Sequence, residues 1–337
     1  MSLATIPGMT WSFAKLPALA IKWGALFLAI SLSFGFAATG HAKSLTNSKN
    51  SYEEKTLQIW DQDVQYHYLV KKNPNVDFDG ETFFEILNGQ KIFRVVINPV
   101  YFEKEAGILF RRFSRDKEQA VHDRFDFNSA KLFQLENHLS KMSHWEQVPA
   151  ELPFDPQVEL KRVQRSLEKL AWQGLFEDCR KNAKSLKEAE RKFVEKFTQD
   201  RIATIERHEA AHVLDLKKAT KSITDQEGFA RFTELNAFYT ELAFGTNPLD
   251  VMSQAIAGLV EELDKGKPVD FSVAKVASII SFLKKCPRFA SRFSAKKMTK
   301  CCLEMMGEFT HKDFQLTATE LYRKNYQGFK PIFVSLR

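Results

Sequence analysis

Two kinds of hydrophobic periodicity divide the chain. Within residues 55–113 apolar and polar residues alternate, for example over residues 64–70, and this alternation is typical of strands with one buried face. Asn88-Gly89 separates the apolar runs 82–87 and 92–97, and such a dipeptide between two apolar runs predicts a β-hairpin. The pattern therefore predicts a small antiparallel sheet, with strand character as far as residue 113.

Pro153 and Pro156 mark a boundary, and almost all of the chain downstream of them is predicted to be helical. Helices are predicted for the segments 158–175, 185–219, 225–241, 248–263, 268–285, 295–309 and 316–326, and apolar residues recur at helical spacing in several of them, for example 158–175 and 248–263. Asn247-Pro248 is typical of a helix start, with Asn as the cap and Pro in the first turn. Residues 114–150 are mixed, with one helix predicted at 128–142. The chain is therefore predicted to be α+β and mostly α, with an N-terminal α+β region at residues 43–150 and a helical domain at residues 151–337.

The first 42 residues have the composition of an export signal. Lys15 and Lys22 supply positive charge, residues 24–38 form an apolar run, and small residues precede Lys43. The apolar run is short for a membrane span, so the sequence predicts a cleaved signal peptide and a periplasmic or secreted protein. The alternative is an uncleaved N-terminal membrane anchor. No later segment is apolar enough to predict a stable span.

The net charge and the cysteine content limit the binding partners, disulfides and metal sites that the sequence predicts. The formal net charge is +7 over 337 residues and is not concentrated in one run, so no nucleic-acid binding is predicted. The four cysteines are Cys179, Cys286, Cys301 and Cys302, and their number permits disulfides in an exported protein without indicating which pairs form. No C-x-x-C spacing is present, which argues against a cysteine zinc site.

The segment from His208 to His212 has the form H-E-x-x-H. It lies within residues 185–219, which contain no Gly or Pro, so the motif is predicted to lie inside a helix. Residues four apart lie on one face of a helix, so both imidazoles can point at one metal ion. Glu209 can then hold a water molecule that the metal polarises. The motif predicts a Zn²⁺ site, and the alternative is a helix on which two histidines happen to be four apart.

A catalytic zinc site needs a third protein ligand and one open position. The segment from Asp225 to Glu241 is predicted to be a second helix, and Glu227, Glu234 and Glu241 share one of its faces because they are spaced by seven. Aromatic and small residues surround this row of acids, which predicts a buried helix with a polar seam. Buried carboxylates need a cation or hydrogen-bond donors, and a metal ion meets that need.

The H-E-x-x-H motif followed by Glu227-Gly228-Phe229-Ala230 resembles the gluzincin metallopeptidases, in particular those similar to aminopeptidase N. In that family the third zinc ligand is the glutamate of an N-E-G-F-A-type segment, on the helix after the motif helix. The resemblance implies a zincin-like helical domain in which His208, His212 and Glu227 bind zinc and Glu209 is the general base.

The wider gluzincin pattern, a glutamate followed three residues later by a small residue, also fits Glu234 and Ala237. Glu234 is therefore the alternative third ligand. Residues 213–226 separate His212 from Glu227, whereas residues 213–233 separate it from Glu234. The segment similarity favours Glu227. The family also places a sheet just before the motif helix, whereas the strands predicted here end far upstream of it.

These features predict an exported zinc-dependent metallohydrolase, specifically a peptidase that acts on a peptide or protein substrate with Glu209 as general base. One alternative is a non-catalytic helical envelope protein with a structural or vestigial metal site. Another is a zinc hydrolase with a non-peptide envelope substrate. Asp215 either orients His212 as a hydrogen-bond acceptor or pairs with a neighbouring lysine on the surface.

Overall fold

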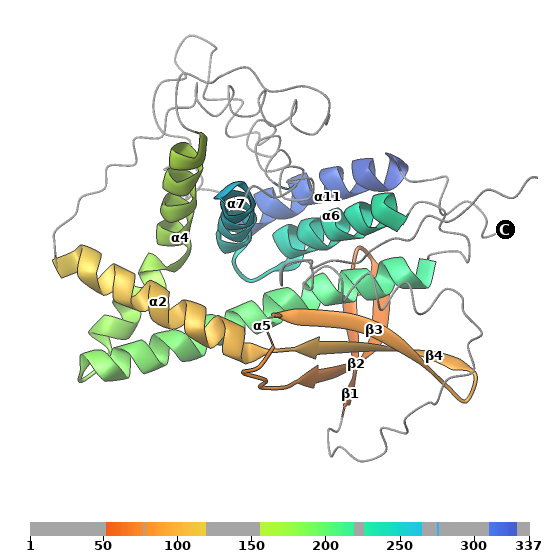
Figure 1. Cartoon of the computed structure of the whole chain (residues 1–337), viewed down its shortest axis with the longest axis horizontal. Coiled ribbons are helices and arrows are strands. Elements are labelled where there is room, and N and C mark those ends of the chain that lie inside the picture. Colours follow the sequence, from red (N-terminus) through yellow and green to blue (C-terminus); the bar gives the residue numbers. More distant parts are fainter. Residues whose placement is uncertain are drawn as a thin grey trace, which may run out of the picture. The chain divides into compact units, whose positions relative to one another are not determined.

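A computed structural model describes residues 52–76, 78–118, 156–218, 226–264, 275 and 310–328. In these residues a small four-stranded sheet comes first and helices follow, so the predicted α+β, mostly α class is confirmed (Figure 1). The following predictions lie outside the described residues: the signal peptide at 1–42, the helices at 128–142 and 295–309, the helix at 268–285 apart from Lys275, and the cysteines Cys286, Cys301 and Cys302. Cys179 is buried as a free thiol.

The sheet consists of β1 (Glu53–Ile59), β2 (Gln62–Val70), β3 (Gly80–Leu87) and β4 (Gln90–Ile97), in the order β1-β2-β4-β3. The predicted hairpin joins β3 to β4, and both of its turn residues have positive φ, 51° at Asn88 and 78° at Gly89. The antiparallel pairing is confirmed within each hairpin, whereas β2 and β4 pair in parallel. The parallel pair arises because β4 returns between β2 and β3.

The turn between β1 and β2 has no glycine. Trp60 and Asp61 have φ values of 50° and 60°, and positive φ is uncommon for a bulky residue. Contacts from distant helices stabilise Trp60 in this conformation. Its ring stacks on Tyr322 at a centroid distance of 4.1 Å, it meets Phe244 edge-on, and its Nε1–H donates to Thr240 Oγ1 at 2.8 Å. Long-range contacts therefore hold this turn.

The predicted strand character between Ile97 and residue 113 is wrong, because helix α2 (Pro99–Glu118) begins directly after β4. Proline is well tolerated in the first turn of a helix, and the Asn98 side chain accepts the Val100 N–H at 3.4 Å. The buried residues of this segment follow a helical stripe rather than alternating. They are Phe102, Ala106, Leu109, Phe110 and Phe113.

The remaining described helices are α4 (Pro156–Lys181), α5 (Leu186–Lys218), α6 (Gln226–Phe244), α7 (Pro248–Asp264) and α11 (His311–Gly328). Helix α5 starts at a capping box, in which Ser185 Oγ accepts the Glu188 N–H and the Glu188 carboxylate accepts the Lys184 N–H. The predicted start of α7 is confirmed, because Asn247 Oδ1 accepts the Asp250 N–H. None of the described helices is both long and apolar enough to cross a membrane.

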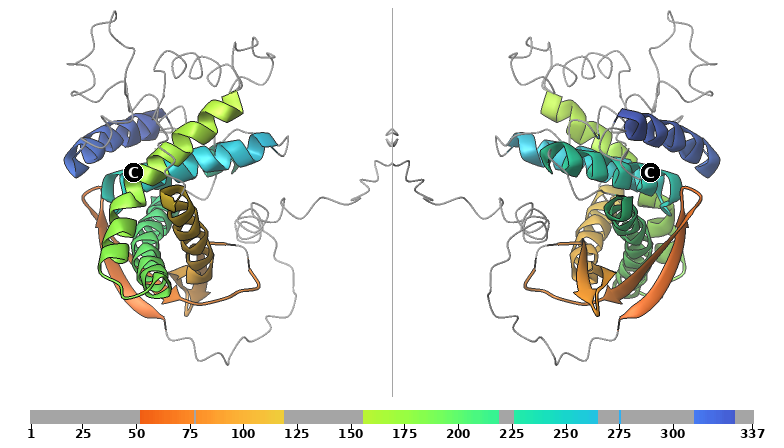
Figure 2. Two further views of the ribbon diagram at one scale, coloured as in Figure 1. Left: turned by 90° about the vertical axis from the view of Figure 1, so that its left-hand side faces the viewer. Right: turned by 90° about the vertical axis from the view of Figure 1, so that its right-hand side faces the viewer.

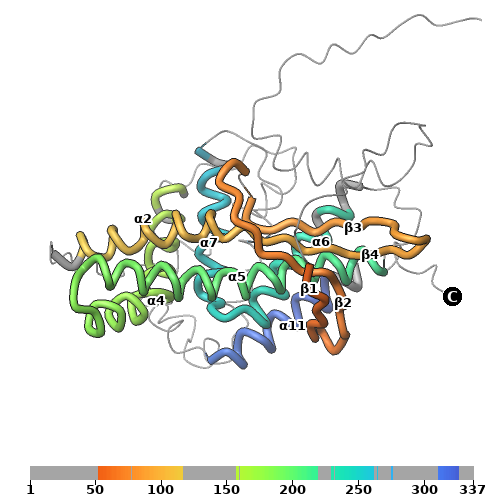
Figure 3. Tube along the Cα trace, turned by 90° about the horizontal axis from the view of Figure 1, so that it is seen from below, coloured from red at the N-terminus to blue at the C-terminus, as the bar shows by residue number. Residues whose placement is uncertain are grey.

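Helix α5 is the centre of the arrangement. Its C-terminal half lies between the sheet on one side and α6 on the other, with α11 packed on α6 (Figures 1 and 2). Its N-terminal half lies beside α2 and α4 (Figure 3). One hydrophobic core contains residues of both the strands and the helices, for example Val95 of β4, Phe110 of α2 and Val213 of α5. The H-E-x-x-H segment of α5 therefore faces packed structure on two sides.

Candidate metal centre

His208 and His212 of α5 and Glu234 of α6 form one cluster. Each offers a ligand atom, and these atoms all lie within 4.8 Å of one another. The two Nε2 atoms are 3.0 Å apart, and Glu234 oxygens lie 3.5 Å from Nε2 of His212 and 4.0 Å from Nε2 of His208. The three side chains are only 9–14% exposed. Packing of α6 on α5 thus gathers two imidazoles and a carboxylate in a nearly dry site.

This donor set fits a metal ion. Two ligand atoms that each lie about 2 Å from a tetrahedral zinc are roughly 3.3 Å apart, and the three observed separations lie around that value. Two histidines and one glutamate are also the ligand type of catalytic zinc sites in which a fourth position takes water or substrate. The three residues could therefore hold a metal ion.

Glu234 is thus the carboxylate that lies near Nε2 of both histidines. Glu227 is also on α6, but it is seven residues earlier, which places it about 10 Å further along the helix axis. Its side chain is outside the described residues. The geometry therefore favours the alternative third ligand that the sequence left open.

Glu241 lies seven residues after Glu234 on α6. It contacts Nδ1 of His208, the ring nitrogen that is not directed at the cluster. Its Oε1 and His208 Nδ1 form a short hydrogen bond, so His208 Nε2 remains directed at the cluster. A carboxylate in this position fixes the ring orientation of a metal-binding histidine. Burial lowers the pKa of His208, but Glu241, Glu234 and Glu209 outweigh it and raise that pKa to about 9. Without a metal, His208 is therefore a cation at neutral pH.

Glu209 points toward the sheet and is 6% exposed. Its Oε2 accepts a hydrogen bond from the Thr82 hydroxyl of β3 at 2.6 Å. Burial raises the pKa of the Glu209 carboxyl, whereas His208, His212 and the Thr82 hydrogen bond lower it. A carboxylate with a raised pKa is a stronger base, which suits a group that must take a proton near neutral pH.

The strand beside Glu209 begins at a glycine for a steric reason. A Cβ on Gly80 would lie 2.6 Å from Glu209 Oε1 and 2.6 Å from Ile205 Cγ2. Only a residue without a side chain lets β3 approach α5 this closely. Neither Gly80 nor Thr82 was identified from the sequence, because no local pattern connects a strand to a helix more than a hundred residues away.

Asp215 is buried rather than paired on the surface. It is 1% exposed, and the Asn236 amide of α6 donates to both of its oxygens, at 3.2 and 3.0 Å. Asn236 Oδ1 in turn accepts from Asn325 of α11 at 2.9 Å. Burial raises the pKa of Asp215 to about 7, although Asn236 and His212 act to lower it. These hydrogen bonds connect α5, α6 and α11.

Lys275 is a member of the site that the sequence did not indicate. Its Nζ lies 3.2 Å from Glu234 Oε2, and it is the one described residue between positions 265 and 309. Burial by itself would raise the pKa of Glu234, but Lys275 and His212 hold it well below its usual range. Glu234 is therefore ionised, as a metal ligand must be.

No protein-family model matches the sequence, and no curated protein or solved structure shows significant similarity to the chain.

Proposed function

We propose that the protein is a zinc-dependent hydrolase that cleaves peptide bonds, with His208, His212 and Glu234 as the zinc ligands. The observation that carries this proposal is the convergence of three elements. Helix α5 contributes the two histidines and Glu209, α6 contributes Glu234, and β3 holds Glu209 through Thr82. A histidine pair, a carboxylate ligand and a buried carboxylate base are the parts that metal-assisted hydrolysis needs.

The residues have distinct roles in this proposal. A bound zinc ion would polarise the substrate carbonyl and make a water molecule acidic near neutral pH. Glu209 takes the proton from the attacking water and later gives it to the leaving amine. Thr82 holds the Glu209 carboxylate in place, and Glu241 keeps His208 in the orientation that directs Nε2 at the cluster.

The position of β3 supports a peptide as the substrate. In the four-stranded sheet β3 is an edge strand, and its first residues lie against Glu209. An extended peptide can add to such an edge through main-chain hydrogen bonds. A peptide bound in this way would pass close to the general base, and this arrangement favours a peptidase over a hydrolase of non-peptide substrates.

The proposal is tested by metal content and hydrolysis together. Elemental analysis of the purified full chain, prepared without chelator, is expected to show near-stoichiometric zinc, and a His208→Ala, His212→Ala double variant is expected to show none. A mixed peptide pool should be cleaved by the wild type, with cleavage lost on chelation and restored by added zinc. Zinc in neither protein, after zinc has been offered back, would refute the proposal.

A non-catalytic role is the second candidate, and Lys275 is the observation that favours it. A buried ammonium already gives Glu234 a cation, so the cluster can be electrically balanced without a metal. This candidate predicts that no zinc is retained and that Glu209→Gln changes nothing measurable. The measurements above therefore distinguish the two functions.

Gly80→Ala is expected to lower kcat by about 100-fold without loss of zinc, because its Cβ would displace the Glu209 carboxylate and small misplacements of catalytic groups have effects of that size. Peptide hydrolysis and zinc content measured on the same preparation would check this. Gly174→Ala is the matched control, because a Cβ at that position meets nothing within 4 Å. Unchanged activity of Gly80→Ala would show that Glu209 is not held by this contact.

Zinc affinity is expected to rise with pH over the range 6–8. Without a metal, His208 carries a proton up to a pKa of about 9, and zinc must displace this proton. Below that pKa the displacement of one proton changes the apparent affinity by about tenfold per pH unit. Competition with a chromophoric chelator at pH 6, 7 and 8 measures the slope. A zinc affinity that does not change with pH would contradict His208 as a ligand.

A further inference from the structure

Lys275 and Glu234 form a largely buried ion pair next to the two histidines. The Lys275 ammonium donates to Glu234 Oε2 at 3.2 Å. A lysine is rarely buried to this extent unless a carboxylate pairs with it, and Glu234 is its one ion-pair partner among the described residues. The ion pair is therefore part of the candidate metal centre rather than a surface contact.

The two carboxylate oxygens of Glu234 have different neighbours. Oε2 accepts the hydrogen bond from Lys275 and lies 4.0 Å from His208 Nε2, whereas Oε1 lies 3.5 Å from His212 Nε2. The hydrogen bond from the ammonium uses a lone pair of Oε2 and offsets its negative charge. Oε1 is therefore the oxygen that Glu234 presents to a metal ion.

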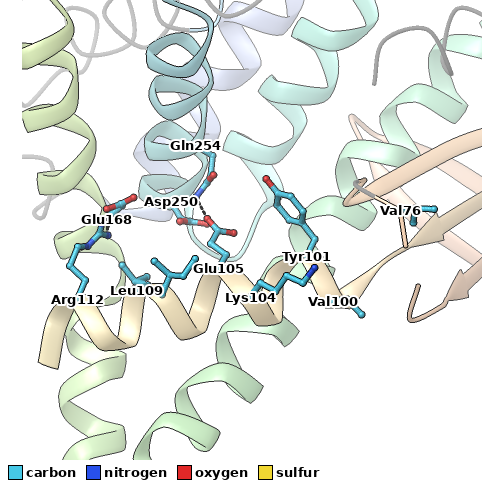
Figure 4. A pocket seen from close by; sticks show the side chains of 11 residues that line it. Val76, Val100, Tyr101, Lys104, Glu105, Leu109, Arg112, Glu168, Asp250 and Gln254 are labelled. Carbon is cyan, nitrogen blue, oxygen red and sulfur yellow. Dashed lines mark hydrogen bonds and ion pairs between the residues drawn. The ribbon is translucent and has the colours of Figure 1, made fainter. Parts of the chain in front are cut away.

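Two other buried acids of the described chain have donors for both of their oxygens. Glu168, at the cavity between α2, α4 and α7, accepts from Gln164 at one oxygen and pairs with Arg112 at the other (Figure 4). Asp215 accepts from the Asn236 amide at both oxygens. In both cases side chains of the protein occupy the whole carboxylate, which is typical of a structural contact.

The pairing of Glu234 with a lysine leaves one oxygen available for a ligand. An arginine can bridge both oxygens of a carboxylate with parallel N–H groups, whereas an ammonium is a compact charge that can bind one of them. A carboxylate held at one oxygen can bind a metal through the other. Together with the two imidazoles this gives three ligand atoms, and a catalytic zinc site needs a fourth, open position.

We infer that Lys275 is a positioning residue of the metal site, which holds Glu234 Oε2 so that Glu234 binds the metal through Oε1 alone. The inference rests on the proposed zinc hydrolase and names the residue that keeps a coordination position open for water or substrate. The ammonium also places a positive charge close to the metal ion, and like charges repel strongly in a buried site. Lys275 therefore weakens zinc binding while it supports turnover.

Lys275→Met separates this role from a merely structural one. Methionine has neither the charge nor the donor, so both oxygens of Glu234 become available to the metal. Zinc affinity is expected to rise at least about tenfold, because a like charge close to the metal has been removed. The kcat for peptide hydrolysis is expected to fall at least about tenfold with KM little changed, because the second oxygen takes the open position. Damage to the site would instead lower affinity and kcat together.

The measurements use the purified full chain and include one that does not depend on activity. Chelator competition gives the zinc affinity, and steady-state hydrolysis gives kcat and KM. Cobalt(II) in place of zinc reports the coordination number, because four-coordinate cobalt(II) absorbs visible light more strongly than five-coordinate cobalt(II). The Lys275→Met protein is expected to show the weaker absorption. Lys55→Met is the matched control, because Lys55 pairs with Glu206 of α5 at 3.0 Å, and it is expected to behave as the wild type.

Lys275→Arg is the second variant and keeps the inference testable if Lys275→Met does not fold. Its guanidinium keeps the positive charge but can bridge both oxygens of Glu234, so zinc affinity is expected to fall at least about tenfold. Circular dichroism shows whether each protein is folded. Wild-type affinity in Lys275→Arg would show that the charge alone matters and would overturn the selective role at Oε2.

The outcomes distinguish the inference from the proposed function. Unchanged or weaker zinc binding in Lys275→Met overturns the role of Lys275 and leaves the zinc hydrolase. Zinc bound by Lys275→Met but not by the wild type supports the effect of Lys275 on Glu234 and overturns the proposed function. Absence of zinc from the wild type and from both variants overturns both.

Discussion

Glu209→Gln is expected to lower kcat for peptide hydrolysis by about 10²- to 10⁴-fold, the usual contribution of a positioned general base, while zinc content stays unchanged. The amide has the same shape as the carboxylate and can still accept the Thr82 hydroxyl hydrogen bond. It cannot take a proton from water. The variant therefore removes the proton transfer from water, but it keeps the proposed zinc ligands and the hydrogen bond to Thr82 of the sheet.

The measurement is steady-state hydrolysis of a cleaved peptide, with zinc determined on the same preparations. Glu195→Gln is the control, because Glu195 is an exposed acid on the same helix that pairs with Arg191 one turn away. A Glu209→Gln protein that keeps wild-type activity and zinc would show that another group is the base. A variant that loses zinc as well would instead show that Glu209 is needed to build the metal site.

Glu234→Gln is expected to lower zinc affinity by more than about 100-fold, which exceeds the effect of removing a residue that only supports a ligand. Glu234 lies 3.5 Å from His212 and is held ionised by Lys275, and glutamine cannot supply the negative charge that a hard anionic ligand brings. Glu227→Gln is expected to change the affinity little, because that residue is two helical turns away on α6.

Chelator competition on the two variants decides which acid is the third ligand, and circular dichroism shows whether each protein is folded. The reverse order, with a large loss in Glu227→Gln and a small loss in Glu234→Gln, would restore the ligand that the segment similarity favoured. Equal small losses would mean that neither carboxylate binds the metal. Because both substitutions lie on one face of one helix, general destabilisation of α6 should affect them similarly.

Several features of the protein were predictable because their causes are local. The H-E-x-x-H pair needs only helical spacing, and residues 186–218 form a helix because they lack Gly and Pro and begin at a capping serine. The hairpin at Asn88-Gly89 needs only two residues that accept positive φ. The start of α7 also has a local cause, because Asn247 caps the helix three residues before Asp250.

Other features depend on how helices and strands that are far apart in the sequence pack against one another. Glu227, Glu234 and Glu241 share one face of α6, and only the packing of α6 on α5 determines that Glu234 meets the histidines while Glu241 meets the back of His208. The turn at Trp60 is similar, because its positive φ is supported by rings from α6 and α11.

The sequence by itself determined the α+β class, the motif helix and the two histidines, since each follows from propensity and periodicity over a few turns. The tertiary structure alone decided the carboxylate beside those histidines and the approach of Gly80 and Thr82 to Glu209. These contacts join residues far apart in the chain, and their distances depend on how whole helices and strands pack rather than on any neighbouring residue.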